Sequence, residues 1–121
     1  MMKISAVYDE YQDIYPHKLK IIKEGIFRIL LDHEAFFVAK YFSMKMTKHD
    51  RQHIKVGFPV SSQRHRLEQF AHHGLGYVLI DKTGTAPDKI YQVIQDNKGK
   101  YYQKIFSIDL QDYELTKNRI L

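Results

Sequence analysis

Apolar residues recur along this chain at two spacings, one helical and one strand-like, and the two alternate from end to end. In the first segment, Val7, Tyr11 and Ile14 follow the helical spacing, and Pro16 then stops the helix. Helices are expected over four segments: 5–14, 33–42 with Asp32 as N-cap, from Ser61 or Ser62 to Gly74, and 109–118.

Strands are expected where β-branched and other apolar residues cluster between turn residues. They cover seven segments: 18–23, 26–31, 43–47, 54–58, 77–81, 89–95 and 101–108. Glu24-Gly25 joins the first two strands, and the segment 96–100 is a strong hairpin signal between the last two. This order predicts a mixed α+β fold: one domain over residues 1–121, with a two-layer arrangement of a mixed β-sheet flanked by helices.

The composition is that of an ordinary globular protein, with 44% hydrophobic and 27% charged residues in a chain of 121 residues. No apolar run approaches the ~20 residues that a membrane span needs, so we expect no membrane contact. There is no cysteine, which excludes a disulfide, a thiol nucleophile and a thiolate metal site. A cytoplasmic location is expected.

Positive charge is concentrated in one part of the chain. The net charge is +5, and the only acidic residue between Lys40 and Arg66 is Asp50. The basic residues of this segment are Lys40, Lys45, Lys48, Arg51, Lys55, Arg64 and Arg66. Such a distribution favours a polyanion, most simply nucleic acid. The alternative is an ordinary solvated basic face with no such partner.

A set of short matches at fixed spacing adds to this pattern. They are Pro16, Gly25, Phe27, Ala35, Thr47-Lys48, Gly57-Phe58-Pro59, Leu67, Gly74 and Val78-Leu79-Ile80. Together they resemble the amino-terminal, mismatch-reading domain of the MutS family of DNA repair proteins, over residues 8–82. No connector, clamp or ATPase region follows in this sequence. The resemblance therefore implies a freestanding copy of the part that touches DNA.

In the MutS family, a Gly-Asp-Phe-Tyr-Glu motif follows a proline break by nine residues. Here Gly25-Ile26-Phe27-Arg28-Ile29 follows Pro16 at the same spacing. The family's phenylalanine wedges into the base stack, which implies the same role for Phe27, with Arg28 beside it on a phosphate. Ile29 stands where the family has a glutamate that contacts a mispaired base, so normal mismatch selection is not expected. Alternatively, Phe27 is a buried strand residue and Arg28 an ordinary exposed arginine.

Other reactive residues indicate no catalytic centre. His49 and His53 lack the further ligands that would complete a zinc site, as does the pair His72-His73. Asp32 and Glu34 suit helix capping and the helix dipole better than a nuclease metal site. We therefore expect neither enzymatic activity nor a cofactor nor a metal ion.

Two functions remain. The first is non-catalytic binding of nucleic acid, for which the resemblance favours DNA over RNA. The residues expected to make the contacts are Phe27, Arg28, Lys45, Lys48, Arg51, Lys55, Arg64 and Arg66. The second is an accessory or adaptor role, in which the main surface meets a protein that acts on nucleic acid. Small proteins resembling this MutS domain are similar in kind to accessory proteins found beside diversity-generating reverse transcriptases. The sequence does not distinguish DNA from RNA or indicate an oligomeric state.

Overall fold

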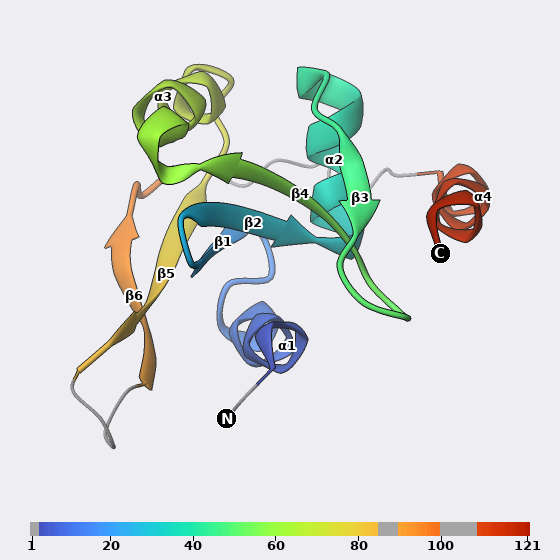
Figure 1. Cartoon of the computed structure of the whole chain (residues 1–121). Coiled ribbons are helices and arrows are strands. Elements are labelled where there is room, and N and C mark those ends of the chain that lie inside the picture. Colours follow the sequence, from blue (N-terminus) through green and yellow to red (C-terminus); the bar gives the residue numbers. More distant parts are fainter. Residues whose placement is uncertain (1–2, 85–89, 100–108) are drawn as a thin grey trace.

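The computed structural model describes residues 3–84, 90–99 and 109–121, and within them the predicted mixed α+β fold is confirmed (Figure 1). Its strands are β1 (Leu19–Glu24), β2 (Phe27–Leu31), β3 (Met46–Lys48), β4 (Ile54–Pro59), β5 (Tyr77–Thr83) and β6 (Ile90–Asp96). Its helices are α1 (Ile4–Ile14), α2 (Asp32–Phe42), α3 (Gln63–His72) and α4 (Leu110–Ile120), with a short 3₁₀ turn, η1 (Val60–Ser62), before α3.

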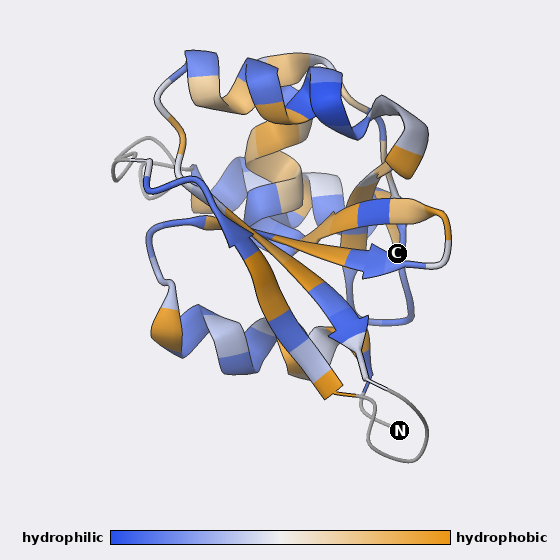
Figure 2. Ribbon diagram, turned by 90° about the vertical axis from the view of Figure 1, so that its left-hand side faces the viewer, coloured by the Kyte–Doolittle hydropathy of each residue, from blue (hydrophilic) through white to orange (hydrophobic). Residues whose placement is uncertain are grey.

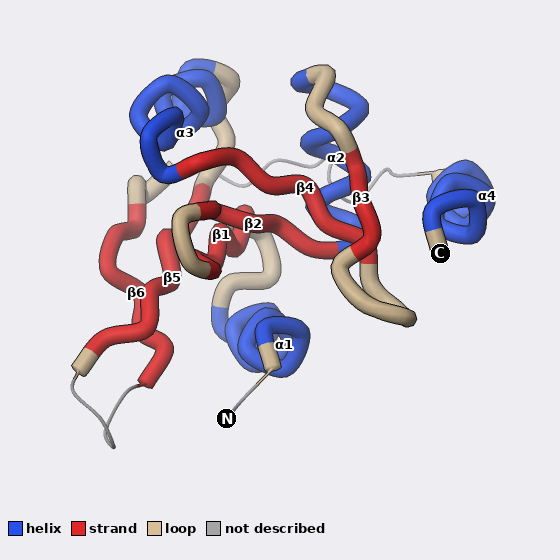
Figure 3. The backbone as a smooth tube through the Cα atoms, in the orientation of Figure 1, coloured by secondary structure: helices blue, strands red, loops and turns tan. Residues whose placement is uncertain are grey.

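The strands form one sheet in the order β3-β4-β2-β1-β5-β6 (Figure 3). One interior pair, β1 and β5, is parallel, and the other described pairs are antiparallel. Both faces of this pair are covered, and the stretches 19–22 and 77–80 are accordingly buried at every position. None of the described helices is long and apolar enough to cross a membrane.

Each face of the sheet has its own core, because alternate strand residues point to opposite faces. On one face, Leu30 and Leu79 pack in one cluster with Phe37 of α2 and Phe70 of α3. On the opposite face, strand residues pack against α1; these are Ile22, Ile29, Leu31, Val78 and Ile80. We call these the α3 face and the α1 face. Figure 2 shows the hydrophobic positions along the strands between the helices.

Several local predictions are confirmed. Gly25 turns the β1–β2 hairpin with a φ of 62°, and Gly74 ends α3 with a φ of 76°. Asp109 caps α4, since its carboxylate accepts the backbone N–H groups of Gln111 and Asp112. The predicted strand over 101–108, and with it that half of the expected hairpin, lies outside the described residues.

Two predicted helix caps are wrong. Ser62 precedes α3 but forms no capping hydrogen bond through its side chain. Asp32 is the first residue of α2 rather than its N-cap, and it has a left-handed φ of 51°. The carboxylate of Asp32 turns away from the helix and accepts hydrogen bonds from a loop on another strand pair. A local sequence rule for capping could not include that distant partner.

Candidate nucleic-acid interface

The turn between β1 and β2 carries two exposed apolar side chains. Ile26 is 73% exposed and Phe27 is 44% exposed. The turn is held from the side, because the backbone N–H of Val60 donates to the carbonyl of Ile26 at 2.8 Å. We call Ile26 and Phe27 the apolar tip. It lies at the margin of the sheet beside the start of α3 (Figure 1).

Strand register shows which residues share a face with the tip. Phe27 pairs with Pro59, Ile29 with Gly57, and Leu31 with Lys55 across β2 and β4. Since Ile29 and Leu31 belong to the cluster on the α1 face, Phe27 and Lys55 lie on that face as well. On β4, Lys55 lies four residues from Pro59, the partner of Phe27. At the usual rise per strand residue, these two positions are about 13 Å apart.

A second feature lies at the other end of β4. Lys45 lies just before β3, Lys48 ends β3, Arg51 lies in the next loop and Lys55 lies in β4; we call these four residues the basic hairpin. Lys45, Lys48 and Arg51 are exposed, and Lys55 is half-buried. Within the described ranges, none of these four side chains forms an ion pair. No side chain in the described ranges therefore neutralises these charges through an ion pair.

The loop of the basic hairpin is held by two aspartates. Asp50 Oδ1 accepts the backbone N–H groups of Gln52 and His53, each at 2.9 Å. The bond from Gln52 holds the pKa of Asp50 below its usual range. Asp32 Oδ2 lies 2.8 Å from Nδ1 of His53, and its Oδ1 accepts the N–H of Ile54 at 3.3 Å. The carboxylates thus fix the loop that presents Arg51.

Arg28 is not where a phosphate contact requires it to be. It is only 3% exposed and lies on the α3 face, because it alternates with Phe27 along β2. Its Nε donates to Oε1 of Gln63 at 2.7 Å, and its guanidinium pairs with Asp81. The prediction that Arg28 stands beside Phe27 at the surface is corrected by this burial. The two neighbours in sequence have opposite surroundings.

The remaining predicted contacts lie on α3. Arg64 is highly exposed and pairs with Glu68, with 3.1 Å between Nε and Oε1. Arg66 is half-buried and donates to Oε1 of Gln69 at 3.2 Å. Arg64 comes directly after Gln63, which binds Arg28 just behind the apolar tip. The predicted basic set therefore divides into the basic hairpin and two arginines on the helix that covers the opposite face.

A buried charged cluster was missed by the sequence analysis. The carboxylate of Glu34 accepts hydrogen bonds from the hydroxyl of Tyr8 at 2.5 Å and from the backbone N–H of Lys20 at 2.7 Å. Its Oε2 also lies 2.8 Å from Nζ of Lys20. Burial raises the pKa of Glu34, an effect that Lys20 opposes. The cluster ties α1, β1 and α2 together. A lysine inside the apolar run 19–22 was its only sequence signal.

The histidine pair 49 and 53 does not become a metal site. In residues 3–84, 90–99 and 109–121, no three His, Cys, Asp or Glu side chains are grouped closely enough to hold a metal ion. His53 is bound to Asp32 instead.

No protein-family model matches this chain, and none of the curated proteins resembles it in sequence to a significant degree.

Proposed function

We propose that this protein binds nucleic acid without catalysing a reaction on it, with Phe27 against the bases and the basic hairpin on the phosphates. The observation that carries the proposal is the exposed apolar tip on the same sheet face as Lys55, a residue next in the basic hairpin to three further cations that form no ion pair among the described residues. Protein surfaces that bind nucleic acid combine exposed aromatic or aliphatic side chains with positive charge.

Each half of this surface has a defined energetic role. Inserting an apolar side chain between base steps costs about a few kcal/mol, which wider contact with the bent duplex offsets. On a single strand, stacking a base on an aromatic ring contributes about 1–3 kcal/mol. The basic hairpin supplies the salt-dependent part of the affinity. The ~13 Å along β4 between the partner of Phe27 and Lys55 matches the width of a DNA major groove, ~12 Å, so that the tip and Lys55 can engage different parts of one duplex.

Mismatch selection of the MutS kind is not part of the proposal. Ile29, at the position of the family's glutamate, is 2% exposed and packs in the core of the α1 face. It has neither a polar atom nor access to a base. We propose instead that bent, distorted or single-stranded DNA is preferred over a regular duplex, because unstacking the bases costs less free energy at such sites. A location in the cytoplasm, with no membrane contact, belongs to this proposal.

The test is fluorescence anisotropy with four probes: matched duplex, mismatched duplex, single-stranded DNA and structured RNA. Four phosphate contacts from the basic hairpin predict a slope of log affinity against log salt of about −3.6 on duplex. The double variant Lys48→Glu/Arg51→Glu should flatten that slope by about 2. Lys82→Glu is the control for a charge reversal elsewhere, set against each single variant, Lys48→Glu and Arg51→Glu: Lys82 is exposed on β5, on the far side of β1 and β2 from β4.

The outcome decides between the two functions. Salt-dependent binding that Lys82→Glu leaves intact supports the nucleic-acid proposal. Absence of binding to every probe at low salt contradicts it. That result would favour an accessory role with a protein partner such as a reverse transcriptase. Ile90 and Ile94, 55% and 49% exposed on β6, would then be the first candidate contacts.

A further inference from the structure

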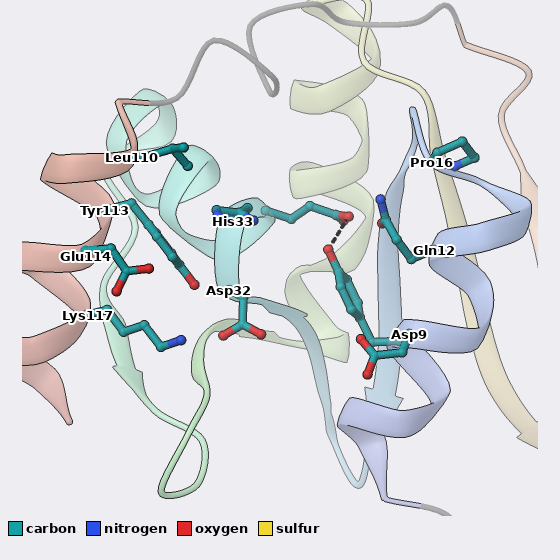
Figure 4. A pocket seen from close by; sticks show the side chains of 11 residues that line it. Asp9, Gln12, Pro16, Asp32, His33, Leu110, Tyr113, Glu114 and Lys117 are labelled. Atoms are coloured by element: carbon teal, nitrogen blue, oxygen red, sulfur yellow. Dashed lines mark hydrogen bonds between the residues drawn. The ribbon is translucent and has the colours of Figure 1, made fainter.

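A cleft of about 560 Å³ lies between α1, the start of α2 and α4 (Figure 4). Its size is that of a small-molecule site. Tyr8, Asp9 and Gln12 line it from α1, and Tyr113, Glu114 and Lys117 line it from α4. The cleft is distinct from the apolar tip and the basic hairpin.

The lining is acidic, although the chain as a whole carries a net charge of +5. Four carboxylates line the cleft, those of Asp9, Asp32, Glu34 and Glu114, against one lysine, Lys117. The charge of Glu34 is paired with Lys20, and the carboxylate of Asp32 contacts the ring of His53. Asp9 and Glu114 have no hydrogen bond or ion pair with any part of the chain that the structure describes. The cleft therefore attracts a cation and repels a phosphate.

A hydroxyl carried by a buried ring opens onto the same space. Tyr113 is only 3% exposed, held by His33 at 4.3 Å and Phe36 at 5.6 Å between ring centroids. Its hydroxyl points into the cleft on the side of Asp32 (Figure 4) and forms no hydrogen bond among the described residues. Burial, together with the charges of Asp32 and Glu114, raises the pKa of Tyr113, so the hydroxyl is protonated at neutral pH.

A second unpaired polar atom lies on the opposite wall. Oε1 of Gln12 is buried and has no hydrogen-bond partner in the described chain. Buried polar groups in proteins are nearly always paired, and exceptions call for an explanation. A carbonyl oxygen and a hydroxyl oxygen both accept hydrogen bonds, as carboxylates do. The ligand that satisfies this set is a donor of several N–H bonds with positive charge.

A metal ion does not fit the arrangement. In the described residues, no three potential metal ligands lie close enough together to coordinate one ion. The acceptors are instead spread over two helices and the volume between them. From this geometry we propose that the cleft binds an organic cation through an ammonium or guanidinium group, held by Asp9, Glu114 and the hydroxyl of Tyr113.

The experiment is isothermal titration calorimetry of the full chain at low salt with two probes. Spermidine represents a free polyamine, and acetyl-arginine amide represents an arginine side chain of a peptide. Binding of one probe in preference to the other identifies the source of the cation. Sodium phosphate is the anionic control and should not bind in the cleft. Amide shifts of Gln12 and Tyr113 in NMR spectra locate the bound cation.

Three variants test the residues involved. Asp9→Asn and Glu114→Gln should each weaken binding about tenfold, the effect of losing one charged hydrogen bond. Tyr113→Phe keeps the ring that packs against His33 and should weaken binding without unfolding α4. Asp13→Asn is the matched control, since it makes the same charge change one turn along α1 at an exposed residue that does not line the cleft.

Two results would overturn the proposal. One is the absence of binding of either cation at millimolar concentration to a chain that circular dichroism shows to be folded. The other is an equal loss of affinity in Asp9→Asn and Asp13→Asn, which would indicate general attraction to surface carboxylates. Neither result bears on nucleic-acid binding, which is measured separately.

Discussion

The guanidinium of Arg28 on β2 reaches over β1 to pair with Asp81 on β5. Its two side-chain partners, Asp81 and Gln63, come from positions far along the chain, 53 and 35 residues away. The side chain of Arg28 is 4% exposed and that of Asp81 is 17% exposed. Through these two partners, Arg28 fastens the β1–β2 hairpin to β5 and to α3, beneath the surface that carries Phe27.

We predict that Arg28→Met destabilises the protein by about 3–5 kcal/mol, because it leaves the carboxylate of Asp81 without its partner in a largely dry site. Urea unfolding followed by circular dichroism measures this change. Arg28→Met combined with Asp81→Leu should recover part of the loss. A smaller effect of Arg28→Met than of the surface variant Arg64→Ala would contradict the structural role given to Arg28.

Phe27→Ala should lower affinity for the preferred nucleic acid by about 1–3 kcal/mol, the value of one base–aromatic contact. It should change the free energy of unfolding by less than about 0.5 kcal/mol, as for other substitutions at exposed positions. Ile94→Ala, at a side chain 49% exposed on β6, is the matched control and should leave affinity unchanged. Anisotropy and urea unfolding on the same preparations separate the two effects. Equal affinity of Phe27→Ala and the unsubstituted chain would remove Phe27 from the interface.

The buried pair of Lys20 and Glu34 gives a prediction about charge. Lys20→Met alone should cost about 3–5 kcal/mol, since the carboxylate of Glu34 then stays buried without its counter-ion. Adding Glu34→Gln removes that charge while keeping an oxygen that accepts the N–H of residue 20, so the double variant should be more stable than Lys20→Met. Thermal unfolding of the three proteins checks the order. A double variant less stable than Lys20→Met would show that the cluster acts through hydrogen bonds rather than charge.

The pH dependence of stability should include a contribution from Asp96. A hydrogen bond from Lys18 lowers the pKa of Asp96, with a further bond from the N–H of Lys98. A carboxyl group whose folded pKa is depressed stabilises the fold above its unfolded pKa of about 4, and this stability is lost as the pH falls through the folded value. The difference in stability between the unsubstituted chain and Asp96→Asn should therefore shrink between pH 6 and pH 3. A difference that stays constant over this range would exclude the Lys18 ion pair as its source.

Sequence patterns were sufficient where the cause of a structure is local. The cap at Asp109, the turn at Gly25 and the end of α3 at Gly74 each depend on residues within one turn. They were insufficient where a side chain is bound by a distant element. The two acidic residues at the start of α2 were both assigned to that helix, yet one holds the β3–β4 loop and the other binds Lys20.

The same distinction applies to the candidate site. The basic segment was visible in the sequence, and the strands on either side of its loop were predicted from their apolar residues. The strand period places consecutive residues on opposite faces, but it does not say which face is covered. The exposure of Phe27 and the burial of Arg28 depend on how α1 and α3 pack on the sheet, which the sequence did not reveal. The cleft depends on α4 lying near α1, for which the sequence contained no signal.

The parallel pairing of β1 with β5 has a consequence for synthesis of the chain. Ile22 can pair with Ile29 in the first hairpin as soon as both have emerged from the ribosome, but its other partner, Ile80, comes 58 residues later. At usual elongation rates this leaves one edge of an apolar strand open for about 3–12 s. During that interval the nascent hairpin presents a strand edge suited to chaperone binding and to pairing with another chain. Slowing translation before residue 77 should therefore raise the misfolded fraction more than slowing it after residue 84.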